Sequence, residues 1–170
     1  MMLRRLLLPA LTVALLGIAL PAAAVIDVNA IGGIDLYGTF DVDELSSNTH
    51  PGFTLGLEII FDVPVVELGA GFEYGFPRAA DDGGGNVDFW QLYGVGRLTV
   101  FTRIYLVGRV GYASSSVDEF FDSSFDDHGL SWGIGAGIRL LPNVKAELLY
   151  SDLSGDVDYD YWSARAVYTF

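Results

Sequence analysis

Charged side chains at alternating positions are the groups in this sequence that could do chemistry. In an extended segment, residues two apart lie on the same face, as Lys145 and Glu147 do. Charges gathered inside a protein could line an ion path, or they could pair into a static plug, because a buried ion must be matched. Ten residues that share such a face form the charge network: Glu58, Glu67, Glu73, Arg97, Arg103, Arg109, Arg139, Lys145, Glu147 and Arg165.

The segment 114–128 is acidic and also carries three phenylalanines. Several carboxylates close together could bind a divalent cation, since hard cations prefer oxygen ligands. Exposed phenylalanines could instead form a binding surface. No spacing here matches a known calcium loop, so a solvated acidic loop remains the alternative. The candidate interaction residues are Asp118, Glu119, Phe120, Phe121, Asp122, Phe125, Asp126 and Asp127.

Catalysis by a nucleophile needs a base within hydrogen-bond reach. The sequence has two histidines, His50 and His128. His128 and Ser131 differ by an odd number, so they face opposite sides of a strand. His50, Asp122 and Ser123 are a set that any acidic, serine-rich loop offers. We therefore expect no enzyme, no catalytic residue, no bound cofactor and no metal centre of defined ligands.

The composition limits the class of protein. The 170 residues suffice for one domain, and 51% of them are hydrophobic, which excludes a disordered chain. The net charge of −13 is opposite to what a nucleic-acid-binding protein needs. The absence of cysteine excludes disulfides, thiolate metal sites and a lipid-modified cysteine.

The first 24 residues have the pattern of a secretory signal peptide. Arg4 and Arg5 begin it, an apolar run follows, and three alanines precede Val25. The apolar run is shorter than the about 20 residues of a transmembrane helix. We expect residues 1–24 to be cleaved and residues 25–170 to form the mature protein.

The mature sequence alternates with period two in stretches of about ten residues, which predicts β-strands. Long polar connections alternate with very short ones at 63–64, 101–102 and 141–143. This alternation over an even number of strands is typical of an all-β, eight-stranded antiparallel up-and-down transmembrane barrel of the outer membrane. The predicted strands lie near 27–40, 52–62, 65–76, 87–100, 103–114, 128–140, 144–152 and 158–170.

The apolar face of such a barrel could point inward, as in a soluble barrel, or outward to lipid. The opposite face holds many glycines and nearly all cations of the mature chain, with only Arg78 assigned to a loop. A lumen that pairs its charges explains this segregation, so we expect the apolar face outward. Leu57→Arg should then prevent assembly, whereas Gly56→Ser should be tolerated.

Large aromatic residues mark both ends of the apolar face. Amphipathic rings collect at the two membrane–water interfaces and form girdles there. A packed core is the alternative explanation for these rings. The predicted girdle residues are Phe61, Tyr74, Trp90, Tyr112, Trp132, Tyr150, Trp162, Tyr168 and Phe170.

Two stretches resemble the small OmpA/OmpX-type barrels and their opacity-protein relatives. One is the strand–turn–strand segment 135–150 around Pro142 and Asn143, and the other is the C-terminal segment 166–170. The resemblance implies that Tyr168 and Phe170 form the signal read by the outer-membrane assembly machinery. It also implies a chain without the peptidoglycan-binding domain that some relatives carry.

These patterns predict a monomeric integral protein of the bacterial outer membrane with a side-chain-filled lumen and acidic extracellular loops. We expect a structural or surface-interaction role, similar to adhesion. A narrow channel for ions or small solutes is the first alternative, and a lipid-modifying enzyme is the second. Expected partners are outer-membrane lipids and lipopolysaccharide, the assembly machinery, and an extracellular ligand of the acidic loops.

Overall fold

The computed structural model describes residues 25–42, 45–63, 65–79, 86–118, 124–154 and 158–170. The predicted signal peptide, residues 1–24, lies outside the described residues. Within the described ranges, no helix is long and apolar enough to cross a membrane.

Nine antiparallel strands lie within the described residues, and eight of them form a closed wall. Closure comes from β1, which pairs with β3 on one side and with β9 on the other. The predicted eight-stranded up-and-down barrel is therefore confirmed, and β2 is a ninth, short strand paired with the end of β1. The strands are β1 (Val25–Val42), β2 (Leu45–Thr49), β3 (Gly52–Val63), β4 (Val66–Ala79), β5 (Asn86–Thr99), β6 (Ile104–Asp118), β7 (Ser124–Leu141), β8 (Val144–Ser154) and β9 (Asp158–Thr169).

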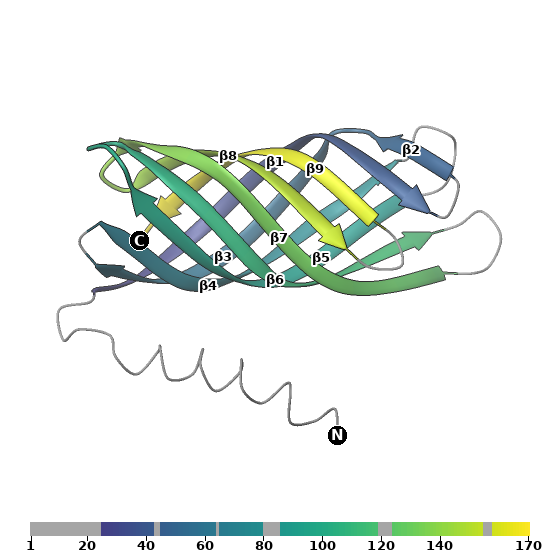
Figure 1. Ribbon diagram of the computed structural model, residues 1–170, viewed down its shortest axis with the longest axis horizontal. Coiled ribbons are helices and arrows are strands. Elements are labelled where there is room, and N and C mark those ends of the chain that lie inside the picture. Colours follow the sequence, from purple (N-terminus) through teal and green to yellow (C-terminus); the bar gives the residue numbers. More distant parts are fainter. Residues whose placement is uncertain (1–24, 43–44, 64, 80–85, 119–123, 155–157) are drawn as a thin grey trace, which may run out of the picture.

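The two ends of the barrel differ (Figure 1). The short connections between β3 and β4, β5 and β6, and β7 and β8 lie at one end, together with the C-terminus. We call this the turn end, and the opposite end, where β5, β7 and β9 begin, the loop end. The tight turn at 142–143 and the hydrogen bonds between Phe101 and Ile104 close two of these connections.

Strand pairing continues farther toward the loop end than the sequence predicts. The segment 115–127, predicted as a loop, extends the β6–β7 ladder as far as Asp118 opposite Ser124. The segment 41–51, also predicted as a loop, contains β2 and its pairing with β1. Both segments are rich in serine and acids, which is typical of a loop, but polar residues can also pair in antiparallel strands.

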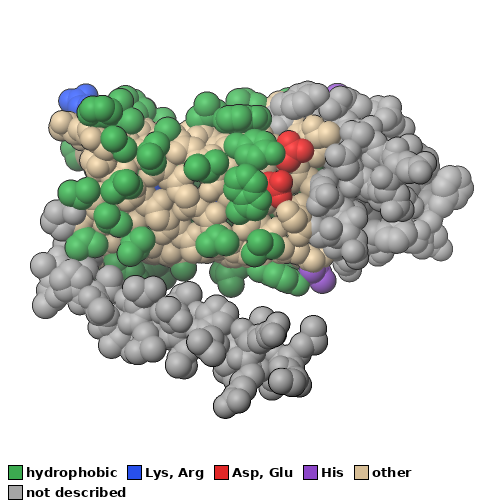
Figure 2. All heavy atoms as spheres, in the orientation of Figure 1, with side chains coloured by type: hydrophobic (Ala, Val, Ile, Leu, Met, Phe, Trp, Pro, Cys, Tyr) green, Lys and Arg blue, Asp and Glu red, His purple; other side chains and the backbone are tan. Residues whose placement is uncertain are grey.

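Exposed and buried side chains alternate along the wall. On β3, Leu55, Leu57 and Ile59 are more than half exposed, whereas Glu58 and Ile60 are buried. Figure 2 shows hydrophobic side chains spread over the outside of the barrel between its two ends. The apolar face therefore points outward, as predicted, and the charged face points into the lumen.

Two β-bulges change which residues face the lumen. On β4 the register shifts between Gly75 and Arg78, at the position of Pro77. Proline lacks the N–H that a ladder needs and is found in sheets at such irregularities. A second shift follows Asp35 on β1. The β4 bulge inserts one residue and thereby turns the side chain of Arg78 into the lumen, where it is buried.

Some lumen-facing glycines make room for large side chains. A Cβ added at Gly71 would lie 2.7 Å from both Glu58 Cγ and Tyr93 Cζ. At Gly56, a Cβ would lie 2.7 Å from the carbonyl oxygen of Phe72. The prediction that Gly56→Ser is tolerated is therefore wrong, because main chain cannot move aside as a flexible side chain can.

The outward face can be tested with one substitution at two depths. Leu57 and Leu141 are both 59% exposed, but Leu57 lies in the middle of β3 and Leu141 at the turn end. We expect Leu57→Arg to lower the free energy of unfolding by about 2–4 kcal/mol and Leu141→Arg by about 0–1 kcal/mol, since the cost of a charge depends on depth in the bilayer. Urea unfolding in lipid vesicles measures both values. Equal losses at the two positions would contradict the assignment of the wall to lipid.

Candidate functional site

Arg97 of β5 is the centre of the ion pairs nearest the turn end. Its Nε lies 2.7 Å from Oε1 of Glu147 on β8. Its Nη2 lies 2.9 Å from Oε2 of Glu58 on β3, and its Nη1 lies 3.9 Å from Glu67 on β4. One buried guanidinium thus holds carboxylates from three different strands across the lumen.

Glu67 carries two further cations. Lys145 Nζ lies 2.7 Å from its Oε2, and Arg139 Nη2 lies 2.8 Å from its Oε1. Arg139 also donates a hydrogen bond of 3.1 Å to Thr99 Oγ1 and is 28% exposed, because it lies at the mouth of the turn end. Three cations face three carboxylates here, and we call them the turn-end network: Glu58, Glu67, Glu147, Arg97, Arg139 and Lys145.

Neutral groups complete the hydrogen bonding of two buried glutamates. Tyr93 donates its hydroxyl to Glu58 at 3.1 Å, and Asn29 donates its amide to Glu58 at 3.3 Å. Tyr105 donates its hydroxyl to Glu147 at 3.0 Å. A buried carboxylate is stable only when its oxygens are paired, and these donors supply the remaining partners.

Closer to the loop end, Arg78 forms an ion pair inside an aromatic cage. Its Nη1 lies 2.6 Å from Asp35 Oδ2 and donates a hydrogen bond of 2.9 Å to Tyr159 Oη. The rings of Phe89, Tyr159 and Tyr161 surround the guanidinium at 5.1, 5.5 and 6.0 Å from its Cζ. Cation–π attraction at such distances adds to the stabilisation of the ion pair. The three rings also shield the ion pair from water.

Glu73 of β4 joins two more arginines in the middle of the lumen. Its two oxygens lie 2.7 Å from Arg165 Nη2 and 3.0 Å from Arg109 Nη2. The Cζ of Arg109 lies 3.5 Å from the centre of the Tyr93 ring, so the guanidinium stacks on it. We call these charges and the caged pair the loop-end network: Asp35, Glu73, Arg78, Arg109 and Arg165.

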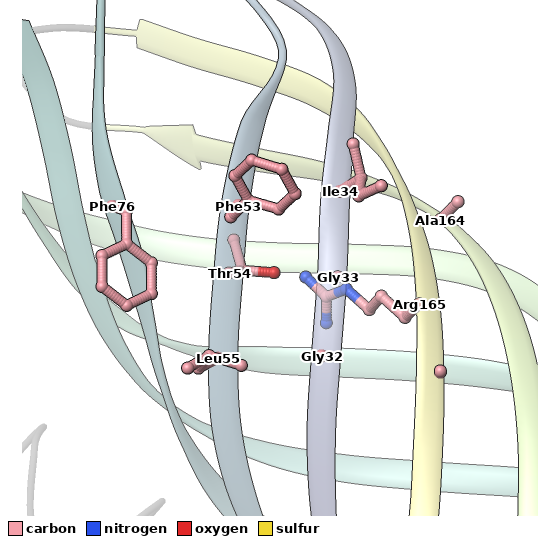
Figure 3. A pocket seen from close by; sticks show the side chains of 10 residues that line it. Gly32, Gly33, Ile34, Phe53, Thr54, Leu55, Phe76, Ala164 and Arg165 are labelled. Atoms are coloured by element: carbon pink, nitrogen blue, oxygen red, sulfur yellow. The ribbon is translucent and has the colours of Figure 1, made fainter.

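A glycine allows Arg165 to reach Glu73 from β9. In Figure 3 the Arg165 side chain reaches from β9 toward Gly33 of β1. A Cβ at Gly33 would meet Arg165 Cγ at 3.1 Å and Thr54 Oγ1 at 2.5 Å. The depression of about 560 Å³ in this view has a mostly apolar lining, including Phe53 and Phe76, and lies on the outside of the wall. It is part of the apolar wall and is not a polar binding site.

The two networks fill the lumen with charged side chains that are held in ion pairs. Ten of the eleven charged side chains have 8% exposure or less, the exception being Arg139. An eight-stranded barrel is just wide enough to be filled by side chains. Buried ions held at these distances form a plug across the lumen, because opening it would leave charges without partners.

The structure changes the membership of the predicted charge network. Arg103 lies in the turn after β5 and is exposed, so its inclusion was wrong: the strand predicted to begin at residue 103 begins at Ile104. Arg78 was assigned to a loop, but it lies in β4 and is buried. Asp35 was missed because its partner, Arg78, was placed elsewhere. The other nine predicted members, from Glu58 to Arg165, lie in the two networks.

Predicted girdle residues at the loop end contact one another. Tyr74 and Tyr150 are half-buried. The three tryptophans are exposed, each to about the same degree as the others. The hydroxyl of Tyr74 donates to Asp88 Oδ2 at 2.9 Å. Ring centroids lie 5.5 to 6.2 Å apart in the pairs Trp90–Tyr112, Trp132–Tyr150 and Tyr150–Trp162. The outward acids next to these rings, on the loop-end side, are Asp88, Asp152 and Asp160.

At the turn end, Tyr168 and Phe170 pack edge to face with ring centroids 5.0 Å apart. Both are exposed, and Phe61 of β3 is half-buried. The backbone N–H of Phe170 donates to the carbonyl of Val28, which ties the last residue to the first strand. The rings at this end are therefore fixed by the closure of the barrel.

The acidic interaction residues are only partly placed. Asp118, Phe125, Asp126 and Asp127 belong to the β6–β7 ladder, but their side chains lie outside the described residues, as do Glu119, Phe120, Phe121 and Asp122. In the described part of the chain, no three His, Cys, Asp or Glu residues are placed to hold a metal ion. His128 is exposed on the outside of the wall, whereas Ser131 is buried, so these two lie on opposite faces.

The sequence and the fold both match outer-membrane proteins. Residues 10–170 match the family model described as an outer membrane protein beta-barrel domain. No curated protein matches the chain in sequence. Ail, the attachment invasion locus protein of Yersinia pestis, solved in complex with the heparin analogue sucrose octasulfate, is similar with a TM-score of 0.60. It is 18% identical, over 85% of this chain and 98% of Ail.

Two further solved structures share this fold. Neisserial surface protein A has a TM-score of 0.60 at 15% identity, over 87% of this chain and 99% of that protein. The N-terminal β-barrel domain of Pseudomonas aeruginosa OprF has a TM-score of 0.53 at 15% identity, over 84% and 97%. At such low identities these similarities establish the fold alone.

The contribution of the turn-end network to stability can be measured by replacing Arg97, the residue at its centre. Arg97→Ala leaves Glu58 and Glu147 buried without their cation, and we expect the free energy of unfolding to fall by about 3–5 kcal/mol. Arg103→Ala removes the same charge from an exposed turn and should change it by less than about 0.5 kcal/mol. Urea unfolding of both variants in the same lipid provides the comparison. A loss for Arg97→Ala as small as that of the control would show that the network contributes nothing to stability.

Proposed function

The chain belongs to the outer membrane protein β-barrel domain family, and we propose that it is a closed, non-enzymatic barrel with a structural or surface-interaction role. Membership of this family places it in the bacterial outer membrane. The proposal concerns what the barrel does there.

The observation that carries the proposal is the continuous filling of the lumen by ion pairs. The Asp35–Arg78 pair and its aromatic cage occupy the loop-end half, and Arg97 joins three glutamates in the turn-end half. A solute would have to separate buried charges at several heights, each at a cost of several kcal/mol. The surfaces that remain for function are the wall and the loop end.

The loop end favours a partner that is neutral or cationic. Its described acids, Asp88, Asp152 and Asp160, lie beside the aromatic girdle, and the whole chain carries a net charge of −13. The complex of Ail holds a sulfated, strongly anionic ligand. An acidic surface repels a polyanion, so we propose an adhesion-like role toward a different extracellular ligand, with the segment 118–127 as the contact. Outer-membrane lipids and lipopolysaccharide would surround the wall of a monomer.

A narrow channel is the second candidate. Arg109, although buried, has two guanidinium nitrogens, Nε and Nη1, without a partner, and a permeating ion could interact with them. An enzyme has less support, because His128 and Ser131 point to opposite faces of β7. We therefore propose neither catalysis nor a cofactor for this barrel.

Planar-bilayer recording separates the closed barrel from the channel. We expect the protein purified from outer membranes to show no steady conductance, because the ion pairs fill the lumen. Arg97→Ala removes the side chain that spans the lumen and should produce discrete openings, whereas Arg103→Ala should stay silent. Steady openings of the unmodified protein would overturn the proposal and move the search for function into the lumen.

We also propose that Tyr168 and Phe170 direct assembly by the outer-membrane machinery. Phe170→Ser should lower the amount of folded barrel in outer membranes several-fold, while refolding of the purified variant in detergent stays close to normal. Phe101→Ser is the matched control, since Phe101 is 68% exposed in a turn at the same end and Phe170 is 75% exposed. Equal losses for both variants in cells would show that general hydrophobicity, and not a C-terminal signal, is what matters.

A further inference from the structure

The two charge networks of the lumen differ in balance. The turn-end network has three cations and three carboxylates. The loop-end network has three guanidinium groups, on Arg78, Arg109 and Arg165, but two carboxylates, on Asp35 and Glu73. Among the described residues, one positive charge of this buried cluster is therefore not compensated.

Both carboxylates of this cluster are held in ion pairs, although Asp35 Oδ1 has no hydrogen-bond donor. Asp35 lies 2.6 Å from Arg78, and Glu73 is shared by Arg165 at 2.7 Å and Arg109 at 3.0 Å. Arg165 also donates through its Nε to Ser163, so its guanidinium is bonded on two sides. The uncompensated charge therefore falls on Arg109, which shares its one carboxylate with a closer arginine.

The unpartnered hydrogen-bond donors of Arg109 agree with this excess of positive charge. Its Nε and Nη1 are shielded from solvent and have no partner in the described structure. The Nη2 contact with Glu73 is ionic, without the direction of a hydrogen bond. On Arg78, Nε and Nη2 lack partners as well. Four donor nitrogens on these two buried arginines thus lack an acceptor.

Aromatic and apolar side chains border this site on two sides. Arg109 stacks on the ring of Tyr93, so its nitrogens point sideways within the lumen. Tyr93 in turn donates to Glu58 of the turn-end network. The cluster of Phe89, Ala113, Leu153, Tyr159 and Tyr161 covers the loop-end side. Unpartnered donors on buried arginines with an excess of positive charge are the chemistry that recognises an anion.

We propose that the loop-end network binds one small inorganic anion, such as chloride, on the unpartnered nitrogens of Arg109, close to Arg78. Water could accept hydrogen bonds from these nitrogens, but it would leave the buried charge uncompensated. A single monovalent anion satisfies the donors and balances three cations against three negative charges. This site goes beyond the proposed function, since a closed barrel needs no ligand in its lumen.

The test compares anions at equal ionic strength. Protein purified from outer membranes is unfolded and refolded in sodium chloride, sodium bromide or sodium gluconate, and heat unfolding is then recorded. We expect chloride and bromide to raise the unfolding midpoint over gluconate by about 5 °C when the halide is at about 100 times its Kd. Arg109→Gln should abolish this difference, and Arg103→Gln, in the exposed turn, should retain it.

The readout is the difference between salts, so a lower stability of Arg109→Gln does not affect it. Should that variant not refold, crystals of the unmodified protein grown in bromide give the second measurement. An anomalous bromide peak beside the Arg109 nitrogens supports the site. A lumen that holds only water there, no halide-specific shift, or a shift that persists in Arg109→Gln overturns the proposal.

Discussion

The pairing of β1 with β9 joins the first strand of the wall to the last, and the described wall presents no open edge within the membrane. Backbone N–H and C=O groups have no water to bind in hydrocarbon, so a spanning sheet must close on itself. Closure also fixes the two faces, because alternate side chains of every strand must point either to lipid or to the lumen. The exposed Leu57 and Ile59 of β3 and the buried Glu58 between them follow from this one constraint.

The small diameter of an eight-stranded barrel then determines what the lumen contains. Glycines such as Gly71 and Gly33 leave space for the side chains of Tyr93 and Arg165. These side chains contact residues of strands that do not pair with their own strand. Tyr93 connects the two halves, since its ring carries Arg109 and its hydroxyl donates to Glu58. The turn-end half is balanced in charge, whereas the loop-end half carries an excess cation. The same packing supports both the proposed closed barrel and the proposed internal anion site.

The sequence predicts the strands and their faces well, because period two survives wherever a strand is regular. It fails where the pairing is irregular. Pro77 is typical of the start of a loop, yet it occupies a bulge that turns Arg78 into the lumen. Because Arg78 was assigned to a loop, its buried partner Asp35 was missed as well. Starting the predicted strand 103–114 one residue too early placed Arg103 in the lumen, although it lies in the turn before β6. The serine-rich segments of β2 and β6 read as loops, since their sequences lack the apolar alternation.

The central claim is that the apolar face meets lipid and the charged face fills the lumen, and spin labels along one strand test it most directly. The chain has no cysteine, so single cysteines at residues 54 to 60 of β3 can be labelled one at a time in the membrane-inserted protein. We predict that collisions with dissolved oxygen oscillate with period two, with high values at Leu55, Leu57 and Ile59 and low values at Thr54, Glu58 and Ile60. The opposite phase, or no oscillation, would contradict the account and favour a barrel with an apolar interior.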